Sequence, residues 1–419
     1  MSLDFLSTTR RRKLLFAALY LSEGAPIGFI WWALPTRLRG DEVPVDRITW
    51  LLSLLVIPWT FKFAWAPLVD IVRTRSWTLR SWIVAAQTVM TLSLVPLLFF
   101  DLKTDFATIA GCLLVHALAA ATQDVAIDAW CISVIKPSER GAFNGWMQSG
   151  MLVGRSLMGG GALVMQAYIG EAAVVVLLCL LTGFSMTLVL FSGSNRGIED
   201  ILQVPLIDRA RHVGRMALRT LGELNTWVGV AFAVTSGAAY QALSVVSGPF
   251  LIDQGFSEEE IGWFFAVPVI ICMICGALLG GWLSDRLGRR RFALFGQVAI
   301  VIPALCLAAA VSQGADQSSL MILTGITFFG TGLFTAAVYS LLMELTNPLI
   351  AATQFSGFMG GVNACEAWSG YTVGRLVTEY GYPTAFTVMA GISIVTLPLL
   401  LAIRIQPPEQ AVSEITPAG

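Results

Sequence analysis

Two carboxylates lie four residues apart inside an otherwise apolar stretch of the chain. Asp124 and Asp128 occur in the run Ala-Thr-Gln-Asp-Val-Ala-Ile-Asp-Ala-Trp, within an apolar segment over residues 106–134. At this spacing on a helix, two side chains share one face, one turn apart. A carboxylate inside a bilayer costs at least about 2.5–3.5 kcal/mol and usually faces a water-filled cavity or a partner charge. The pair therefore predicts a polar site enclosed by helices.

Three further ionisable residues interrupt apolar segments: Glu23, Lys62 and Arg155. Desolvation raises the pKa of a carboxyl group and a nearby cation lowers it. An acid in such a set can bind a proton when it is unpaired, and release it when Lys62 or Arg155 approaches. We predict Asp124 as the proton-coupling acid, with Glu23 and Asp128 as alternatives. Lys62 or Arg155 is then the countercharge, or the anchor for an anionic group of a substrate.

The composition of the chain indicates that lipid is its main solvent. The chain is 56% hydrophobic and 13% charged, with a mean hydropathy of +0.74, whereas soluble domains have about 25% charged residues. The net charge of −1 comes without a sustained basic patch, so no nucleic-acid partner is expected. All seven cysteines fall in apolar segments, where Cys behaves as a small hydrophobe, and we expect no metal and no cofactor.

The elements that must position these charges are membrane-spanning helices, each of about 20 apolar residues. Twelve segments qualify: 14–35, 47–70, 78–100, 106–134, 140–167, 172–192, 226–251, 260–283, 291–312, 319–343, 351–378 and 383–404. The longest polar gap follows the sixth segment and is basic. We predict an all-α membrane protein with an N-terminal six-helix bundle (1–192), a cytoplasmic basic linker (193–225) and a C-terminal six-helix bundle (226–419).

The distribution of basic residues predicts the orientation in the membrane. If both termini are cytoplasmic, 19 of the 26 Lys and Arg residues lie on the cytoplasmic side. Only four lie in external loops: Arg37, Arg39, Arg47 and Lys103. The positive-inside rule favours this arrangement. We therefore expect a multi-pass protein of the cytoplasmic (inner) membrane with both termini in the cytoplasm.

The buried charges are predicted to lie at a similar depth. Counting 1.5 Å per residue from the helix ends places Glu23, Lys62, Asp124 and Arg155 between the cytoplasmic third and the midplane. A static salt-bridge network that holds helices together is the alternative to proton coupling. For Arg155 there is a further alternative, because its segment also carries a face of small residues that suits tight helix packing. That face consists of Gly150, Gly154, Gly159, Gly160 and Gly161.

Short sequences recur in the two halves of the chain. Phe143-Asn-Gly-Trp-Met147 in the fifth segment matches Phe355-Ser-Gly-Phe-Met359 in the eleventh. Val153-Gly-Arg155 and Val373-Gly-Arg375 follow in the same two segments. Internal repeats of this kind are typical of secondary transporters that arose by duplication.

The run Gly281-Trp-Leu-Ser-Asp-Arg-Leu-Gly-Arg-Arg290, between the eighth and ninth segments, resembles a motif of the major facilitator superfamily. In that motif the glycine permits close helix approach, the aspartate meets a helix terminus and the arginines hold cytoplasmic faces together. The resemblance assigns these roles to Gly281, Asp285, Arg286 and Arg289, and places Asp70 in a degenerate first-half copy. It implies two six-helix bundles around a cavity lined by the first, fourth, seventh and tenth helices.

Three other stretches resemble the peptide/acetyl-CoA transporter family, which includes the AmpG-type muropeptide permeases. They are Lys62–Asp70, Ala121–Ala129, and Ser138-Glu-Arg-Gly141 with the downstream Gly154-Arg155. This resemblance implies proton-driven symport into the cell by alternating access. The implied substrate is a small amphiphilic solute such as a muropeptide-like sugar-peptide. Siderophore import and carriage of a CoA thioester are the alternatives within the superfamily.

Polar residues of the second half complete the predicted substrate site. They are Tyr240 and Gln241 on the seventh segment, Tyr339 on the tenth, and Glu366 and Arg375 on the eleventh. The last two are nine positions apart, nearly opposite in helical phase, so we expect them to pair with other helices. Trp31 joins the set as a stacking surface, although anchoring at the membrane interface is the ordinary role of such a residue.

Two other classes of membrane protein were weighed against a transporter. An enzyme acting on lipid-linked groups needs a nucleophile or metal cluster, and the chain has only two His residues, far apart. A sensor built on a transporter fold would be expected to lose the buried charges or gain a soluble output domain. No G-x-x-x-x-G-K-[ST] loop for ATP occurs. We therefore predict a non-enzymatic, monomeric secondary transporter whose partners are a small solute, protons and the lipid bilayer.

Overall fold

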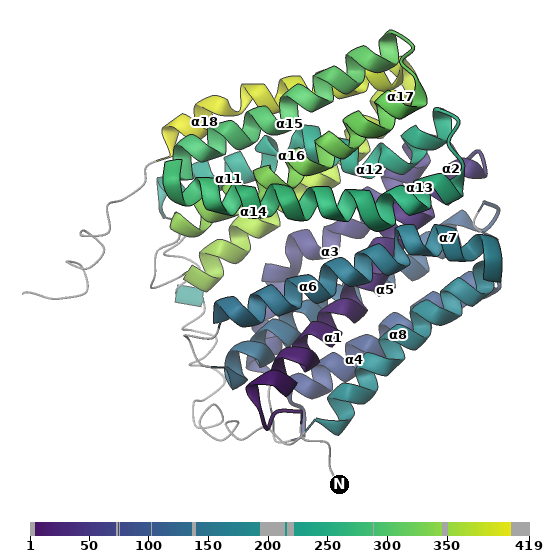
Figure 1. Cartoon of the computed structure of the whole chain (residues 1–419). Helices are drawn as coiled ribbons and strands as arrows, with labels where there is room; N and C mark the ends of the chain where they lie inside the picture. Colours follow the sequence, from purple (N-terminus) through teal and green to yellow (C-terminus); the bar gives the residue numbers. More distant parts are fainter. Residues whose placement is uncertain are drawn as a thin grey trace, which may run out of the picture.

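The computed structural model describes residues 5–72, 74, 76–101, 103–135, 140–192, 214–215, 222–287, 289–345 and 351–403. Over these ranges the secondary structure is helical, with no strand. In Figure 1 the helices of residues 9–191 occupy one side of the molecule and those of residues 224–402 the other. Most of the predicted linker 193–225 lies outside the described residues, so the exact division of the chain stays a prediction.

The first half contains six helical units. The helices are α1 (Thr9–Gly28) with the π-helical turn η1 (Phe29–Ala33) and α2 (Leu34–Gly40), α3 (Val45–Ile71), α4 (Leu79–Leu94) with η2 (Val95–Leu98), α5 (Phe106–Val134), α6 (Arg140–Met158) with α7 (Gly160–Ile169), and α8 (Glu171–Phe191). They coincide with the first six predicted segments.

The second half repeats this pattern of long helices. The helices are α11 (Leu224–Ser236) with α12 (Ala238–Asp253), α13 (Glu258–Phe264) with the π-helical turn η4 (Phe265–Val269) and α14 (Ile270–Leu287), α15 (Arg289–Ser312), α16 (Gln317–Glu344), α17 (Ala351–Val395) and α18 (Leu397–Ala402). They cover the last six predicted segments.

Ten of these helices or helix runs are long and apolar enough to cross a membrane. The number is lower than the predicted twelve at two places in the chain. The fifth predicted segment, which α6 and α7 cover, is not among the ten. The eleventh and twelfth are joined in the run Gln354–Ala402, although Gly381 has φ +80° and interrupts the helix there. The predicted all-α membrane fold is therefore confirmed.

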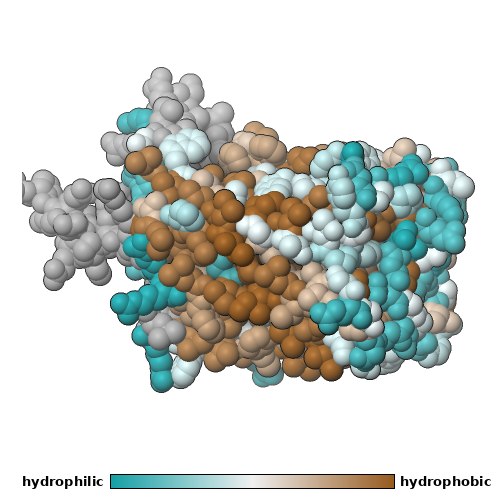
Figure 2. All heavy atoms as spheres, turned by 90° about the horizontal axis from the view of Figure 1, so that it is seen from above, coloured by the Kyte–Doolittle hydropathy of each residue, from teal (hydrophilic) through white to brown (hydrophobic). Residues whose placement is uncertain are grey.

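The surface of the molecule fits a lipid environment. Figure 2 shows a brown, hydrophobic belt between two ends where hydrophilic residues gather. Large apolar side chains are exposed on the candidate spanning helices, among them Leu180 (63% exposed) and Leu278 (70% exposed). Such exposure would be costly in water and is expected where the solvent is hydrocarbon.

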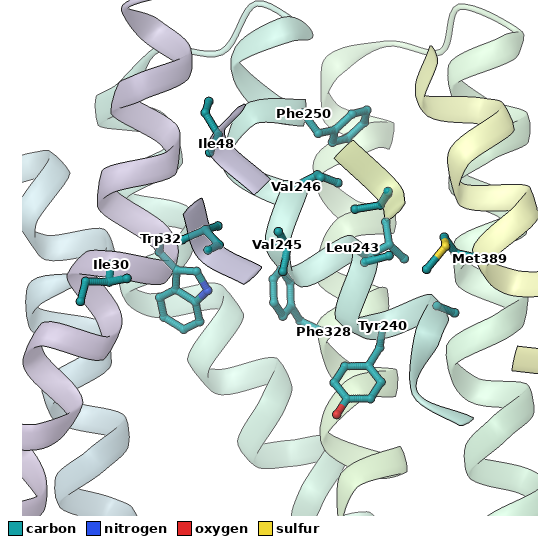
Figure 3. Close-up of a cluster of buried hydrophobic side chains, with 14 of the residues drawn as sticks. Ile30, Trp32, Ile48, Tyr240, Leu243, Val245, Val246, Phe250, Phe328 and Met389 are labelled. Carbon is teal, nitrogen blue, oxygen red and sulfur yellow. The ribbon is translucent and has the colours of Figure 1, made fainter. Parts of the chain in front are cut away.

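A single hydrophobic core joins the two halves at one end of the molecule. We call the end of the molecule where α1 begins and α18 ends the terminal end. The end where this core joins the two halves is called the opposite end. Trp32 from η1 stacks on Phe265 from η4, with ring centroids 5.4 Å apart and planes at 15°. Phe328 from α16 adds an edge-to-face contact with the same Trp32 ring. Figure 3 shows Trp32 and Ile48 of the first half beside Val245 and Val246 of α12.

Glycines bring α1 and α6 into direct backbone contact. A Cβ atom at Gly24 would overlap the carbonyl group of Met151, and one at Gly154 would overlap the carbonyl group of Leu21. Only a residue without a side chain fits at these positions. Small residues serve this purpose in membrane helices, where no hydrophobic effect drives one helix against another. The close contact fixes where the residues next to these glycines point.

We predict that Gly154→Leu destabilises the protein because its side chain would force α6 away from the backbone of α1. The expected loss is roughly 1–3 kcal/mol or more of unfolding free energy, as for other overpacked sites. Thermal unfolding in detergent measures it. Gly183→Leu is the matched control, since a Cβ at Gly183 meets nothing within 4 Å. Equal stability of the two variants would contradict the packing argument.

Candidate functional site

A cavity of about 370 Å³ lies between the two halves. Its lining includes eight of the residues predicted to act in the site: Glu23, Trp31, Lys62, Asp124, Asp128, Arg155, Tyr339 and Glu366. These side chains come from α1, η1, α3, α5, α6, α16 and α17. Residues far apart in the sequence therefore converge on one polar chamber.

The ion pair in this cavity joins Lys62 on α3 to Asp124 on α5. The Nζ atom of Lys62 also donates a hydrogen bond to Oδ2 of Asp124. The Lys62 side chain is 24% exposed and that of Asp124 is 10% exposed, so water reaches the pair only in part. Pairing offsets the desolvation of both groups.

The second aspartate has a different partner. The hydroxyl group of Tyr20 on α1 donates a hydrogen bond to Oδ1 of Asp128 at 2.5 Å. Tyr20 is not among the site residues predicted from the sequence. Its signal was present, because Tyr20 precedes Glu23 by three positions and so shares a face of α1 with it.

Glu23 is the most deeply buried acid of the cavity, at 2% exposure. Its Oε2 atom has no hydrogen-bond partner among the residues that the structure describes. An ionised carboxylate without a full set of partners is expensive to bury. Glu23 is thus the acid of this cavity whose ionised form is least stabilised by its protein contacts.

Arg155 extends from α6 into the cavity. Within the described part of the chain, no hydrogen bond or ion pair of its guanidinium group is found. Glu366 and Glu23 are the acidic groups whose charges act on it through space. Of the predicted glycine face, Gly150 and Gly154 pack against α1, whereas Gly160 packs against Gly262 and Ala266 of the second half. The Arg155 side chain lines the cavity. Arg155 is therefore available to an anionic solute.

Aromatic rings form one wall of the chamber. The indole Nε1 of Trp31 donates a hydrogen bond to Oε1 of Glu366 at 2.6 Å, which links the two halves. The ring of Trp31 makes an edge-to-face contact with Trp59, with centroids 5.8 Å apart. Asn363 donates to the backbone carbonyl of Trp59 at 3.1 Å. Trp59 and Asn363 line the cavity but were not selected from the sequence.

Three predicted substrate-binding residues lie outside this cavity. Tyr240 and Gln241 are buried on α12, where Gln241 donates to the hydroxyl group of Tyr240 at 2.9 Å. The seventh segment does not contribute to the described lining. Tyr240 packs against Phe334 of α16, with ring centroids 5.2 Å apart, and farther along α12 Gly248 packs against Thr36 of α2. Arg375 is exposed and pairs with Glu379 on its own helix at 3.2 Å, not with another helix as predicted.

The predicted conformational motif is described only in part. The side chains of Asp70, Asp285 and Arg289 lie outside the described residues. Arg286 places its guanidinium group 3.9 Å from the ring centroid of Trp282. A Cβ at Gly281 would meet nothing within 4 Å, so close helix approach does not occur there. It occurs one and five residues earlier, where Gly280 and Gly276 face Leu333 and Phe329 of α16.

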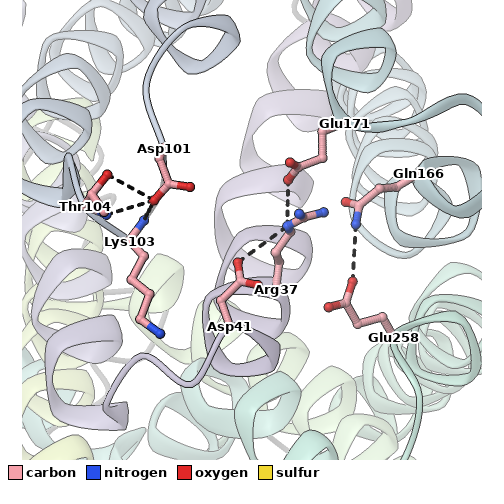
Figure 4. Close-up of polar contacts among 8 residues, drawn as sticks. All are labelled: Arg37, Asp41, Asp101, Lys103, Thr104, Gln166, Glu171 and Glu258. Atoms are coloured by element: carbon pink, nitrogen blue, oxygen red, sulfur yellow. Dashed lines mark hydrogen bonds and ion pairs between the residues drawn. The ribbon is translucent and has the colours of Figure 1, made fainter.

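The two ends of the cavity differ. At the opposite end, Arg39 of α2 pairs with Asp253 of α12 at 2.6 Å, and Tyr382 donates to the same carboxylate at 2.7 Å. Figure 4 shows a second contact between the halves, Gln166 with Glu258, beside the Arg37–Glu171 ion pair. Toward the terminal end, the lining continues to Met343, next to the last residue of α16. The chamber is therefore sealed at the opposite end.

No group of three potential metal ligands occurs among the residues described. Cys272 and Cys275 have the spacing of a C-x-x-C pair, and both are free thiols on α14. They lie in the apolar belt, with no third ligand described beside them. The polar chamber is thus the site that the geometry offers for chemistry.

Comparison with known proteins agrees with this geometry. Residues 229–418 match the Major Facilitator Superfamily. The chain is 27% identical over 394 residues to an uncharacterised protein of Haemophilus influenzae, covering 89% of each. It is 25% identical over 418 residues to the anhydromuropeptide permease of Escherichia coli, covering 94% of this chain and 80% of that one. The crystal structure of a D-xylose-proton symporter superposes with a TM-score of 0.74 at 11% identity, over 95% and 98% of the two chains.

These matches confirm the family resemblance predicted from the sequence. The chain is an integral membrane protein with the fold of the major facilitator superfamily, to which its residues 229–418 are similar. Its sequence relatives include AmpG-type transporters and an anhydromuropeptide permease.

We predict that Lys62→Met destabilises the folded protein by up to about 3–5 kcal/mol, because it leaves the Asp124 carboxylate buried without its cation. Asp124→Leu should also destabilise, by stranding the lysine. The double variant should recover most of the loss. A double-mutant cycle of thermal unfolding in detergent measures the coupling. Additive losses would mean that the ion pair contributes nothing to stability.

Proposed function

We propose that this transporter imports a small amphiphilic anion, such as a muropeptide-like sugar-peptide, through the cytoplasmic membrane in symport with protons. The proposal draws on the anhydromuropeptide permease of Escherichia coli, to which the chain is similar over 94% of its length. It also draws on the residues of the cavity, which suit a solute that is polar, ring-containing and negatively charged.

The single observation that carries the proposal is that one cavity contains both an arginine without a described ion-pair partner and a wall of aromatic rings. Arg155 has no ion-pair partner among the described residues, and its guanidinium group is suited to bidentate binding of a carboxylate. Trp31 and Trp59 offer ring faces and edges to the apolar side of a sugar. Asn363, Tyr339 and Gln148 supply neutral hydrogen-bonding groups in the same chamber.

Proton coupling is proposed to use the acids that meet on α1 and α5. Asp124 is held by Lys62, Asp128 by Tyr20, and Glu23 lacks a partner for one oxygen. A proton taken up by Asp124 would release Lys62, which could then turn to another acid or to the solute. Proton binding and solute binding are coupled whenever both compete for the same cations.

The proposed orientation places the terminal end in the cytoplasm, as the excess of basic residues on that side favours. The structure then corresponds to an inward-facing state, because the opposite end is sealed by contacts between the halves. Import requires a second state in which those contacts separate and the terminal end closes. The Arg39–Asp253 pair and the Trp32–Phe265 stack belong to the proposed external gate.

We predict that Asp124→Asn abolishes accumulation of an anhydromuropeptide driven by a pH gradient, because the amide cannot carry the proton. Exchange of labelled for unlabelled solute across proteoliposomes without a gradient should persist, since the cavity remains. Lys103→Gln, which removes an exposed loop charge outside the cavity, should behave as wild type. Undiminished gradient-driven uptake by Asp124→Asn would exclude Asp124 as the coupling acid.

We predict that Arg155→Gln weakens solute binding by about 10- to 100-fold, from the loss of about 1.5–3 kcal/mol of charge-assisted hydrogen bonding. Titration calorimetry of the purified protein with an anhydromuropeptide measures this. The variant should keep or gain thermal stability, because the wild-type guanidinium group has no described ion-pair partner. A solute whose peptide carboxylates are amidated should bind to the wild type and to Arg155→Gln with equal affinity. Equal binding of both solutes by both proteins would remove Arg155 from the site.

We predict that Asp253→Asn opens the sealed end more often, because it weakens the contacts of both Arg39 and Tyr382 with this carboxylate. The readout is alkylation of Thr36→Cys, a fully buried position facing α12, by a membrane-impermeant maleimide. Labelling of the Thr36→Cys/Asp253→Asn double variant should be several-fold higher than that of Thr36→Cys alone. Asp101→Asn, at the same end but bonded only to its own loop, is the control. Unchanged labelling would show that this pair does not hold the gate closed.

A further inference from the structure

A second hollow lies on the side of the molecule at the opposite end. Its volume is about 500 Å³, and none of its lining residues is shared with the central cavity. It is formed by α3 and α5 of the first half and α17 of the second. The residues that matter for its chemistry are Arg47, Trp50, Gly111, Leu114, Tyr371 and Arg375. We call it the lateral groove.

The lateral groove opens toward the surroundings of the helices. Trp50 is 44% exposed and Tyr371 is 46% exposed, although both lie on membrane-spanning helices. Along α5 the lining runs from Phe106 to Leu114, which corresponds to about 12 Å at 1.5 Å per residue. The groove thus extends from the end of the helices into the apolar belt.

Two arginines lie at its polar end. The guanidinium group of Arg47 is 5.1 Å from the ring centroid of Phe106 and forms no ion pair with a described residue. Arg375 pairs with Glu379, but both side chains are about half exposed, at 57% and 48%, and such pairs contribute little. Asp46 is the acid of the lining, and its carboxylate accepts a hydrogen bond from the backbone N–H of Arg47. The lining itself therefore holds two cations and one acid, and the guanidinium group of Arg47 is free of a described ion pair.

The rest of the groove is apolar and has room for a chain. A Cβ at Gly111 would meet nothing within 4 Å, so the surface of α5 is hollowed at that point. Leu54, Ala107, Ala110 and Leu114 surround it. Nearby, Gly374 of α17 packs directly on Thr49 of α3, so the groove borders the contact between the two halves.

We propose that the lateral groove binds one anionic glycerophospholipid. Its phosphate lies between Arg47 and Arg375, and one acyl chain lies along α5 past Gly111 to Leu114. The order of groups matches that of a phospholipid, with two arginines at one end of the groove and apolar side chains along the rest. Because α17 belongs to the second half, the bound lipid contacts both halves at once.

Native mass spectrometry of the purified full chain in detergent, with added phosphatidylglycerol, tests the proposal. Two variants remove different parts of the site: Arg47→Gln/Arg375→Gln removes the phosphate ligands, and Gly111→Phe fills the floor without a clash at Cβ. Each should lower the lipid-bound fraction by about tenfold or more at a fixed lipid concentration. Lys103→Gln is the charge control, and Gly183→Phe, at another open glycine, is the size control.

The outcomes separate cleanly. Loss of bound phosphatidylglycerol in both site variants, with wild-type binding in both controls, supports the groove as a lipid site. Equal lipid binding by Gly111→Phe and Gly183→Phe overturns it, whatever the arginine variant does. A wild-type dimer that Gly111→Phe converts to monomer also overturns it, because the groove would then be covered by a second copy of the chain. Thermal unfolding of each variant checks that Gly111→Phe is folded.

Discussion

Burying a charged side chain between membrane helices costs free energy unless other helices supply an ion pair or a hydrogen bond to it. Lys62 and Asp124 neutralise each other and thereby join α3 to α5. Tyr20 donates to Asp128 and joins α1 to α5. Trp31 donates to Glu366 and joins the two halves across the chamber. The polar contacts that make the burial of these acids tolerable therefore also determine how the helices around the cavity are placed. Within the described part of the chain, Arg155 and one oxygen of Glu23 have no such contact in the chamber.

In α1 and α6, a glycine that packs one helix against the other lies next to a charged residue of the cavity. Gly24 follows Glu23 and faces the backbone of α6, while Gly154 precedes Arg155 and faces the backbone of α1. Consecutive residues on a helix are rotated by about 100°, so a side chain next to a packing glycine points away from that contact. In both helices it points into the cavity. The close approach of α1 and α6 thus holds an acid and a base in the chamber from opposite helices.

Features that depend on residues close together in the sequence were predictable, and features that depend on contacts between distant segments were not. The helices were predictable because each one corresponds to an unbroken run of apolar residues in the sequence. The joining of the last two segments across Gly381 reduced the number of separate runs. The acids and bases of the first half were found because a charge inside an apolar segment is conspicuous. The facing of α12 was not predictable, since it depends on Gly248 meeting Thr36 in the other half. Trp59 and Tyr20 were missed because aromatic residues are common in membrane helices with no functional role.

The turn η1 connects the chamber to its seal. Trp31 faces the cavity and bonds to Glu366, while the next residue, Trp32, stacks on Phe265 at the sealed end. Both residues lie in a π-helical turn, and Phe265 begins a second one in η4. Such turns are local departures from the α-helix that often occur at functional sites. Because Trp31 and Trp32 are adjacent on one rigid turn, a rotation of η1 that changes the contact with Glu366 must also change the stack that closes the opposite end. If the proposed solute displaces Trp31 from Glu366, the neighbouring Trp32–Phe265 stack at the sealed end is therefore expected to change with it.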